Sequence, residues 1–439
     1  MKEILKKIGI KDDGFELLTV NNLIEKKIID KPLDGNHGEI HPKSEDYVVE
    51  GVPFIMASDI RNGTIDYTNC NFITRNQADS LRKGFAKNGD VLVTHKATIG
   101  RTAIVNYAQQ PYIMLTPQVT YYRILNTKRL NNIYLKYYFD SELFQKTLHL
   151  WAGSGSTRAY LGITEQGKLP VIIPPIKKQE KIAAILSAFD ERIENNKQRI
   201  TLLGKISEEI YKEWFVRLRF PNYKDVKIDK GVPEGWSKIP IEVLCNEIRS
   251  GIKKADLDVS ERYIGLEHLP RKSITIDNYS TADSINSDKL LFKERDILFC
   301  KIRPYLHKVS LTHFSGSCST DAIVIRPTDR KYEGFLLFTL FSEYFIELAT
   351  IASKGTKMPR ADWDFLKKQE LNIPSDDLLN DFQKKFEVIF AQIIYLNKSN
   401  ELMNLTKEKL LDRLISGKLS VEDIDIQFPP SMLEEEEVA

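Results

Sequence analysis

Basic and hydroxyl-bearing side chains occur in two pairs of loops, at corresponding places in the two halves of the chain. Lysine and arginine can neutralise DNA phosphates, arginine can also bind a guanine edge, and serine and threonine can do either. One such residue alone is typical of any solvated surface, but the recurrence predicts a nucleic-acid interface. The predicted DNA-binding residues are His95, Lys96, Thr98, Arg101, Ser154, Thr157 and Arg158 in the first half, and Lys301, Arg303, His307, Lys354, Thr356, Lys357 and Arg360 in the second.

The short motifs that mark a catalytic or metal site are missing from the sequence. There is no GxGxxG, GxxxxGK[ST] or HExxH pattern, and the seven histidines show no ligand spacing. Ile173-Pro-Pro-Ile176 lacks the polar residue with which adenine amino-methyltransferases hold the target amine. Gly153-Ser-Gly-Ser-Thr157 fits either a phosphate cradle or a flexible loop. We therefore predict a chain without catalytic residues and without a metal site.

The elements that carry these loops begin with short strands. Apolar runs at 52–56, 63–67, 90–93, 101–105 and 118–122 are separated by turn residues, which predicts β-strands. The polar loop Asp34-Gly-Asn-His-Gly38 before them contains residues that favour tight turns, and its pattern predicts a hairpin turn. A helix is expected over 132–150 from its apolar spacing. A buried strand over 169–173 then leads to Pro174, a favourable helix entrance.

The same order of elements restarts after Pro221. The run 263–266 resembles 54–57, 295–299 matches 89–93, and 371–374 matches 171–174. A second helix is expected over 332–351. We therefore predict an α+β protein in which two mixed α/β domains stand in tandem, separated by two long helices.

Each long helix is predicted from apolar residues at alternating steps of four and three, the 3.5-residue period of a coiled-coil seam. At 1.5 Å per residue each helix is about 50–60 Å long. Two independent amphipathic helices, each packed on its own domain, are the alternative. The first seam consists of Ile182, Leu186, Phe189, Ile193, Asn196, Ile200, Leu203, Ser207, Ile210 and Trp214, and the second, 200 positions later, of Phe382, Phe386, Ile389, Ile393, Leu396, Asn400, Met403, Lys407, Leu410 and Leu414.

Equal units bind each other most simply about a two-fold axis, so we expect an antiparallel coiled coil with pseudo-two-fold symmetry. Pairing Ile182 with Leu414 places Asn196 opposite Asn400. A buried asparagine pair lowers stability but fixes the register, because any other register leaves an amide facing an apolar side chain. The residues expected to pair the helices are Ile182, Phe189, Ile193, Asn196, Leu396, Asn400, Met403 and Leu410.

Length and composition set broader limits. A chain of 439 residues is expected to form two to four domains. Four scattered cysteines predict a reducing compartment, and the charged N-terminus and the lack of an 18-residue apolar run predict a cytoplasmic protein outside the membrane. Residues 421–439 contain seven acidic residues and no lysine or arginine, so the rest of the chain carries a net charge of +9, which is compatible with a polyanionic partner.

Taken in order, several motifs resemble the DNA specificity (S) subunit of type I restriction–modification enzymes. These motifs cover nearly the whole chain and follow the family's order. Two features depart from it: the second helix entrance, Pro374-Ser-Asp-Asp, lacks the second proline, and the acidic tail is not part of the family's pattern. The motifs are the DGNHG and PK pattern between Asp34 and Lys43, PPxxxQ at 174–179, the helix end at 210–216, Pro233-Glu-Gly-Trp236, and the helix end at 410–419.

The resemblance implies a first target-recognition domain over 1–175, a first conserved helix over 176–220, a second target-recognition domain over 221–375, a second conserved helix over 376–420, and an acidic tail over 421–439. Each recognition domain is expected to read half of a bipartite double-stranded DNA target, with the paired helices setting the gap. The implied partners are two methyltransferase (M) subunits and restriction/translocase (R) subunits. S-adenosylmethionine (SAM), ATP and magnesium are expected in those partners and no cofactor in this chain, a non-catalytic part of an adenine methyltransferase and ATP-dependent endonuclease.

Two other functions fit parts of the sequence. A coiled-coil adaptor that binds only proteins would show no salt-dependent affinity for DNA. A stand-alone SAM-dependent methyltransferase would bind SAM without any partner.

Overall fold

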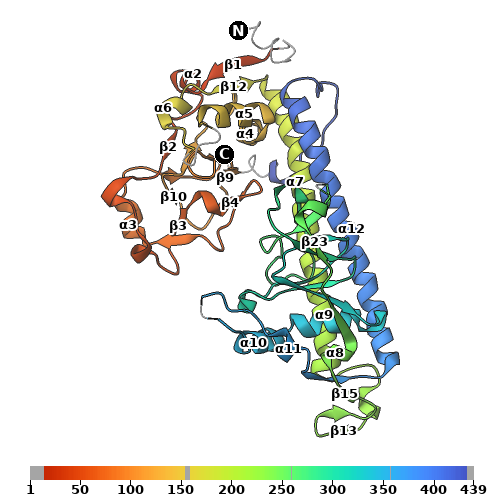
Figure 1. Cartoon of the computed structure of the whole chain (residues 1–439). Helices are drawn as coiled ribbons and strands as arrows, with labels where there is room; N and C mark the ends of the chain where they lie inside the picture. The colour runs from red at the N-terminus through yellow and green to blue at the C-terminus, as the bar shows by residue number, and fades with distance from the viewer. Residues whose placement is uncertain (1–13, 154–158, 259, 356, 433–439) are drawn as a thin grey trace. The chain divides into compact units, whose positions relative to one another are not determined.

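Two compact units make up the chain. The computed structural model describes residues 14–153, 159–258, 260–355 and 357–432 (Figure 1). The first unit comprises Met1–Arg192 and Met403–Ala439, and the second comprises Ile193–Leu402. Their boundaries fall within two long helices, α7 (Ile176–Tyr211) and α12 (Asp376–Ile415), and α7 continues into a π-helical segment, Lys212–Val216. The fold is α+β.

The first unit is built on two four-stranded sheets, ordered β2-β11-β8-β9 and β6-β3-β10-β7. Neighbours are antiparallel except β3 and β10, and β1 pairs with β12 beside the start of α7. The strands are β1 (Glu16–Thr19), β2 (Leu33–Asp34), β3 (Val52–Ile55), β4 (Ile60–Arg61), β5 (Thr64–Ile65), β6 (Asn71–Ile73), β7 (Phe85–Ala86), β8 (Val91–Thr94), β9 (Thr102–Ile104), β10 (Ile113–Leu115), β11 (Val119–Tyr122) and β12 (Pro170–Ile173), and the helices are α2 (Val20–Glu25), α3 (Arg75–Ser80), α4 (Asn132–Asp140), α5 (Glu142–Trp151) and α6 (Ile163–Gln166).

The second unit repeats this topology. Its sheets are ordered β16-β24-β21-β22 and β19-β18-β23-β20-β17, with β18 and β23 parallel, and β15 pairs with β25. The predicted duplication is therefore confirmed, with β17 as an added edge strand. The strands are β13 (Ile228–Asp229), β14 (Val232–Pro233), β15 (Ser237–Pro240), β16 (Cys245–Ile248), β17 (Gly251–Ile252), β18 (Arg262–Ile264), β19 (Ser280–Thr281), β20 (Lys289–Phe292), β21 (Ile297–Cys300), β22 (Val309–Leu311), β23 (Gly316–Cys318), β24 (Ala322–Pro327) and β25 (Glu370–Ile373), and the helices are α8 (Ile241–Leu244), α9 (Glu333–Phe341), α10 (Glu343–Ile351) and α11 (Trp363–Leu366).

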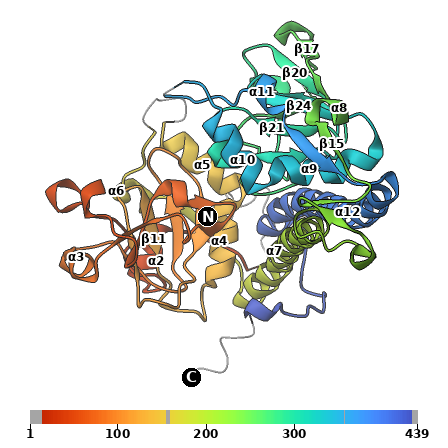
Figure 2. The same cartoon turned by 90° about the horizontal axis from the view of Figure 1, so that it is seen from below.

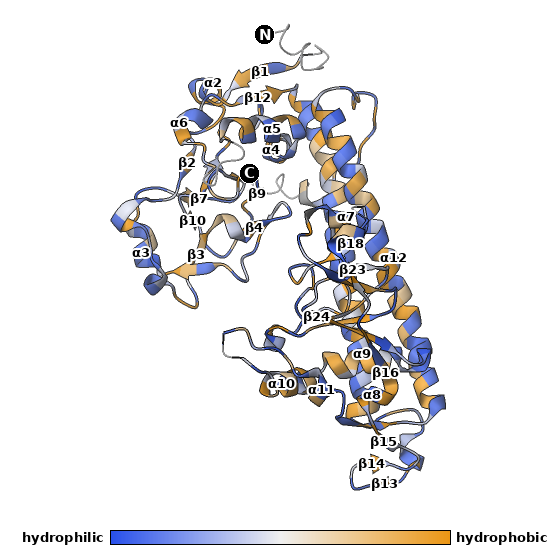
Figure 3. Ribbon diagram, in the orientation of Figure 1, coloured by the Kyte–Doolittle hydropathy of each residue, from blue (hydrophilic) through white to orange (hydrophobic). Residues whose placement is uncertain are grey.

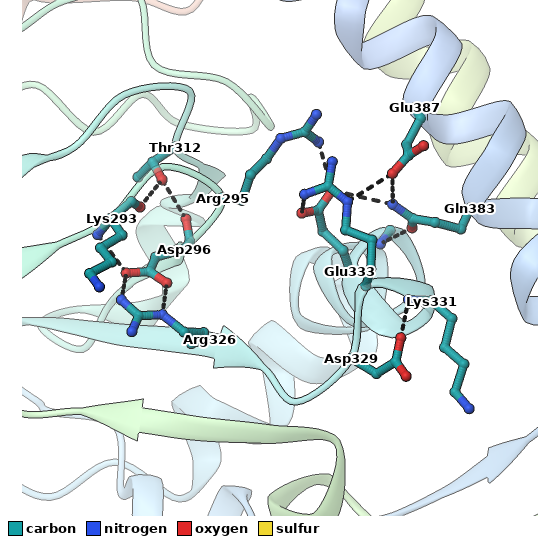
Figure 4. Close-up of polar contacts among 12 residues, drawn as sticks. Lys293, Arg295, Asp296, Thr312, Arg326, Asp329, Lys331, Glu333, Gln383 and Glu387 are labelled. Atoms are coloured by element: carbon teal, nitrogen blue, oxygen red, sulfur yellow. Dashed lines mark hydrogen bonds and ion pairs between the residues drawn. The ribbon is translucent and has the colours of Figure 1, made fainter.

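A buried carboxylate occupies the same place in both units. Arg123 donates to the two oxygens of Asp90 at 2.9 and 2.7 Å, and Arg326 donates to Asp296 at 2.7 and 2.7 Å (Figure 4). Both aspartates are at most 2% exposed. A buried carboxylate is tolerated only when it is paired and hydrogen-bonded, so each bidentate arginine is required where it stands. The duplication thus extends to individual charges.

The prediction of a single helix over 132–150, and of another over 332–351, is wrong, because each segment forms two helices. Ser141 and Ser342 adopt extended backbone, and their hydroxyl oxygens accept hydrogen bonds from the backbone N–H of Phe144 and Phe345. A serine hydroxyl offers the backbone an alternative partner and thereby starts a new helix. The apolar spacing continues through the break, so the period alone did not reveal it.

In the second unit α9 is buried along its whole length, between the strands and α12 (Figures 2 and 3). The Phe338 ring lies 6.4 Å from that of Phe382 and 5.8 Å from that of Phe386, both on α12. Such an apolar helix belongs to a core. Among the described residues no single helix is long and apolar enough to cross a membrane, and only Arg330–Phe341 with Glu343–Ile351, bent by 61°, meet that test together.

The long helices contact each other within each unit. In the first unit Ile182 shares a hydrophobic cluster with Leu414, and Lys407 Nζ lies 2.5 Å from Asp190 Oδ1. In the second unit Asn196 Nδ2 donates to Asn400 Oδ1 at 2.8 Å. Ile200 and Leu396 belong there to one core cluster. Of the other residues expected to pair the helices, Ile193 is buried, and Phe189, Met403 and Leu410 are half-buried.

The described part of the acidic tail packs against the start of α7 in the first unit. Lys181 Nζ donates to the carbonyl oxygens of Val421, Glu422 and Ile424 at 3.1, 2.7 and 2.8 Å. Val421 is 2% exposed and belongs to the core cluster of the first unit. One ammonium group with three carbonyl acceptors therefore attaches this segment to the helix.

We expect Asn400→Leu to lower the free energy of unfolding by about 1–3 kcal/mol, because the buried Asn196 amide loses its partner. The double change Asn196→Leu with Asn400→Leu should recover most of that loss, since no amide is then left unpaired. Urea denaturation of the full chain measures both effects. Equal losses in the single and double variants would contradict the role given to this hydrogen bond.

Candidate nucleic-acid interface

The loop between β8 and β9, residues 95–101, is fixed to its surroundings through Arg101. The Arg101 guanidinium donates to the carbonyl oxygens of Ala57 and Ile60, both at 3.1 Å, and its backbone N–H donates to Thr94 Oγ1 at 2.9 Å. Ala97, at the tip, has φ +66°, a left-handed conformation that costs free energy for a residue with a Cβ. The loop therefore presents Lys96 and Thr98 to solvent on a held backbone.

Two predicted site residues, His95 and His307, are buried. His95 is 0% exposed, and its Nδ1 lies 3.0 Å from the Leu161 carbonyl oxygen. His307 is 3% exposed, and its Nε2 lies 2.7 Å from the Phe341 carbonyl oxygen. Burial lowers the pKa of both imidazoles, against the opposing effect of Asp34 on His95 and of Glu343 on His307. In this structure they support their loops from beneath and do not face solvent.

The corresponding loop of the second unit, residues 301–308, contains two left-handed residues. Arg303 has φ +48° and an exposed side chain, and its backbone N–H donates to the Pro359 carbonyl oxygen at 2.8 Å. His307 has φ +52°. Lys301 Nζ donates to the Thr320 carbonyl oxygen at 2.7 Å, so this half-buried ammonium is held beside the sheet. Left-handed non-glycine residues occur in both corresponding loops, which marks these loops as strained in the way that binding sites often are.

The loop after α10 supplies the remaining cations of the second unit. Lys354, Lys357 and Arg360 are exposed. Lys354 Nζ lies 2.5 Å from Asp362, and Arg360 Nε lies 3.2 Å from Asp321. These exposed ion pairs are weak in water and can exchange for a phosphate without a large loss. Of the other predicted residues, Ser154, Thr157, Arg158 and Thr356 lie outside the described residues.

The geometry favours an anionic ligand that presents many hydrogen-bond acceptors. Lysine and arginine offer only donors, and Thr98 adds a hydroxyl group that donates or accepts. Within the described ranges, no group of three or more histidine, cysteine, aspartate or glutamate residues has metal-binding geometry. The interface therefore suits the phosphates and base edges of a nucleic acid.

The structure also brings side chains to this place that the sequence analysis did not single out. Tyr160, 47% exposed, lies against the β8–β9 loop, with its ring centroid 5.9 Å from Lys96 Nζ. Lys83 contacts the polar loop 34–38 through Asp34. The DGNHG pattern pointed to that loop, but no local signal connects it with positions 83 and 160.

Comparison with known proteins gives consistent results. The family model for the type I restriction modification DNA specificity domain matches residues 28–204. The type I restriction enzyme MjaIX specificity subunit of Methanocaldococcus jannaschii is 25% identical over 406 residues, covering 87% of this chain and 90% of that protein. The EcoDI specificity subunit of Escherichia coli is 24% identical and covers 62% of this chain and 67% of its own. The crystal structure of a type I S subunit from M. genitalium has the same fold, with a TM-score of 0.52, 14% identity, and coverage of 92% of this chain and 97% of that one.

Acidification should destabilise the protein through the two buried imidazoles. Because their pKa values in the folded chain lie below the ordinary value, the unfolded chain binds protons first, and the free energy of unfolding falls as the pH drops through about 6.5. The loss is at most about 1.4 kcal/mol per pH unit for each imidazole.

Urea denaturation between about pH 7.5 and 5.5 tests this, because His95→Asn and His307→Asn should each weaken the pH dependence of the free energy of unfolding. His149 is exposed, so His149→Asn is the matched control and should leave the pH dependence as it is. A wild-type pH dependence in both buried-site variants would contradict the assignment.

Proposed function

From the match to the type I restriction modification DNA specificity domain, we propose that the chain is a specificity subunit of this kind and that each of its two units reads one half of a bipartite double-stranded DNA target. Phosphate contacts supply affinity that does not depend on sequence, and contacts to base edges supply the sequence preference. The chain acts as the recognition component, without catalytic residues of its own.

One observation carries the proposal: the same fold occurs twice, and each copy presents cations on the same loop. The β8–β9 loop presents Lys96, whereas the β21–β22 loop presents Arg303. The surrounding frame is the same in both units, down to the buried Asp90 and Asp296 pairs. Because the two units present different side chains on the same fold, each is expected to bind a different DNA half-site, so the target is asymmetric.

The long helices form an antiparallel coiled coil that separates the two half-sites, with recognition domains over 1–175 and 221–375. Three contacts support this arrangement. Residue 182 clusters with 414, Lys407 meets Asp190, and Asn196 bonds to Asn400. From one pair to the next, the residue number rises along α7 and falls along α12, as antiparallel pairing requires.

The partners are two methyltransferase subunits, with restriction/translocase subunits joining for cleavage. Support comes from apolar side chains that the long helices leave in solvent. Tyr395 is 72% exposed, Val388 63%, Leu202 58% and Ile206 50%. Val388 and Tyr395 are seven residues apart, the spacing of a second helix-packing seam. SAM, ATP and magnesium bind to these partner subunits, and none binds to this chain.

The test is DNA binding by the chain assembled with its methyltransferase subunits. Mapping of methylated adenine in a host that carries the system should reveal one bipartite motif. A duplex with that motif should bind more tightly than a scrambled one, and its affinity should fall steeply with salt. No sequence preference, or SAM binding by this chain alone, would overturn the proposal.

The second unit offers a matched pair for the same assay. We assign Arg303 to a base contact and Lys357 to a phosphate contact. Arg303→Ala should therefore cost about 1–3 kcal/mol of binding free energy at one base position of one half-site, whereas Lys357→Ala should weaken binding to all sequences alike. Binding that is unchanged in both variants would remove these residues from the interface.

Tyr395→Glu and Leu202→Glu should weaken assembly with the methyltransferase subunits, because each places a charge in an apolar helix contact. Both side chains are mostly exposed in the chain itself, so its unfolding should change little. Size-exclusion chromatography with light scattering measures the assembly. Glu194→Gln, at an exposed polar position of α7, is the control, and full assembly of both apolar-site variants would contradict the proposed surface.

A further inference from the structure

Asp34 lies at the centre of a polar cluster in the first unit. It is 2% exposed, yet it is the acceptor for two basic side chains: His37 Nε2 donates to its Oδ2 at 2.8 Å, and Lys83 donates to its Oδ1. Burial opposes ionisation of Asp34, but the hydrogen bonds from Lys83 and His37 outweigh it and hold the pKa of this carboxyl below its usual value. The carboxylate therefore fixes the positions of one imidazole and one ammonium group.

The loop is built to hold this arrangement. A Cβ at Gly35 would lie 1.9 Å from the Leu115 carbonyl oxygen, so only glycine fits there. Asn36 is 2% exposed and bonds to the backbone of two consecutive residues, accepting from the Arg82 N–H at 3.0 Å and donating to the Lys83 carbonyl oxygen at 2.6 Å. The loop thus fixes the backbone that carries Lys83 as well as its ammonium group. A hairpin turn alone requires none of these side-chain contacts.

The cluster adjoins the β8–β9 loop. His95 Nε2 lies 4.0 Å from Asp34 Oδ2, too far for a hydrogen bond, and has no hydrogen-bond partner in the described part of the chain. Leaving a buried ring nitrogen unpaired costs free energy, and such groups mark strained or functional places. The His95 ring is 5.7 Å from that of Tyr160, which also lies beneath Lys96. Two basic side chains, His37 and Lys83, and the buried His95 ring therefore surround one carboxylate, beside Lys96 and the exposed Tyr160.

Both basic side chains are partly open to solvent: the His37 side chain is 49% exposed and the Lys83 side chain is 32% exposed. An ammonium group has three donors, and Lys83 directs one of them to Asp34, so donors remain for an external acceptor. The exposed side of the cluster is thus basic, and its buried side is acidic and fixed.

Resting on the proposed function, we propose that residues 34–38 form a second DNA-contacting element of the first unit, in which buried Asp34 positions His37 and Lys83 to bind a phosphodiester of the duplex next to Lys96 and Tyr160. Asp34 is a positioning residue, because it acts through His37 and Lys83 and does not itself meet the DNA.

The described part of the second unit has no counterpart of this element. In the strand register, the position of Asp34 opposite Thr120 corresponds to that of Arg249 after β16. Arg249 is exposed and pairs with Glu247 at 2.7 Å. The element therefore acts on one half-site only, which separates its effect from a general loss of folding or of charge.

The experiment uses the full chain assembled with its methyltransferase subunits and a fluorescent duplex that contains the methylated bipartite motif. Affinity is measured over a series of salt concentrations for wild type, Lys83→Ala, His37→Ala with Lys83→Ala, and Asp34→Asn. Lys128, an exposed lysine outside the cluster, provides the matched loss of one charge as Lys128→Ala.

For Lys83→Ala the slope of log affinity against log salt should become less steep by about 0.9, the value of one phosphate contact. Asp34→Asn should also reduce the slope, and should add no further change in the background of His37→Ala with Lys83→Ala. Lys128→Ala should retain the wild-type slope. A purely structural role would lower the fraction of active protein and leave the slope unchanged.

Wild-type slopes in Lys83→Ala and in the double variant would overturn the inference, even if Asp34→Asn does not fold. A wild-type assembly without sequence preference would instead overturn the proposed function, so the two failures are distinguishable. Duplexes with one scrambled half complete the test, because the variants should alter the response to only one of the two halves.

Discussion

In each unit a glutamine of the long helix satisfies backbone groups at the start of the helix that packs on the sheet. Gln179 is 0% exposed; its Oε1 accepts from the Asn131 N–H at 2.9 Å, and its Nε2 donates to the Arg129 carbonyl oxygen at 3.0 Å. Gln383 Oε1 accepts from the Gly334 N–H at 2.9 Å, beside the buried Glu333 carboxylate (Figure 4). The first N–H groups of a helix have no partner within it, and leaving one buried and unpaired costs about 1–3 kcal/mol. This bond ties the start of α4 to α7, and the start of α9 to α12.

This constraint explains how the second helix entrance departs from the first and still performs the same task. Gln383 stands four residues, about one helical turn, beyond the position that corresponds to Gln179. A turn later the side chain returns to the same face of the helix, so it can again reach the start of the covering helix. Arg295 and Arg330 then balance the buried Glu333, with contacts of 2.7 and 3.2 Å that have no counterpart among the described residues around Gln179.

The corresponding loops of the two units differ in their side chains, although the sheets and helices that carry them have the same topology. Their cations are largely held in ion pairs or by backbone carbonyl groups, such as Lys301 against Thr320 and Arg360 against Asp321. In the role proposed for these loops, a cation that already has a weak partner is pre-positioned but partly neutralised, which would limit sequence-independent attraction to DNA and leave more of the discrimination to base contacts. A fixed frame with variable loops is therefore suited to changing a target without changing the fold.

Local regularities were open to prediction from the sequence. The 3.5-residue period and its repeat after 200 positions determined the long helices and the duplication, because side chains on one helix face recur at fixed steps. The DGNHG pattern marked a polar loop, but the hairpin turn expected there is wrong, because β2 pairs with the distant β11. The cations indicated which loops to examine. The helix breaks at Ser141 and Ser342 were not predicted, because the apolar spacing continues through them.

Burial and long-range pairing were decided by the tertiary structure alone. Nothing near position 95 shows that the His95 ring is enclosed, and nothing near position 34 shows that its carboxylate meets a lysine 49 residues away. A local pattern constrains which backbone conformation is favourable, whereas the environment of a side chain is set by segments that arrive from elsewhere in the chain. The sequence by itself therefore determined the repeat and its helices, and only the packed fold decided which of the basic side chains face solvent and which support them from within.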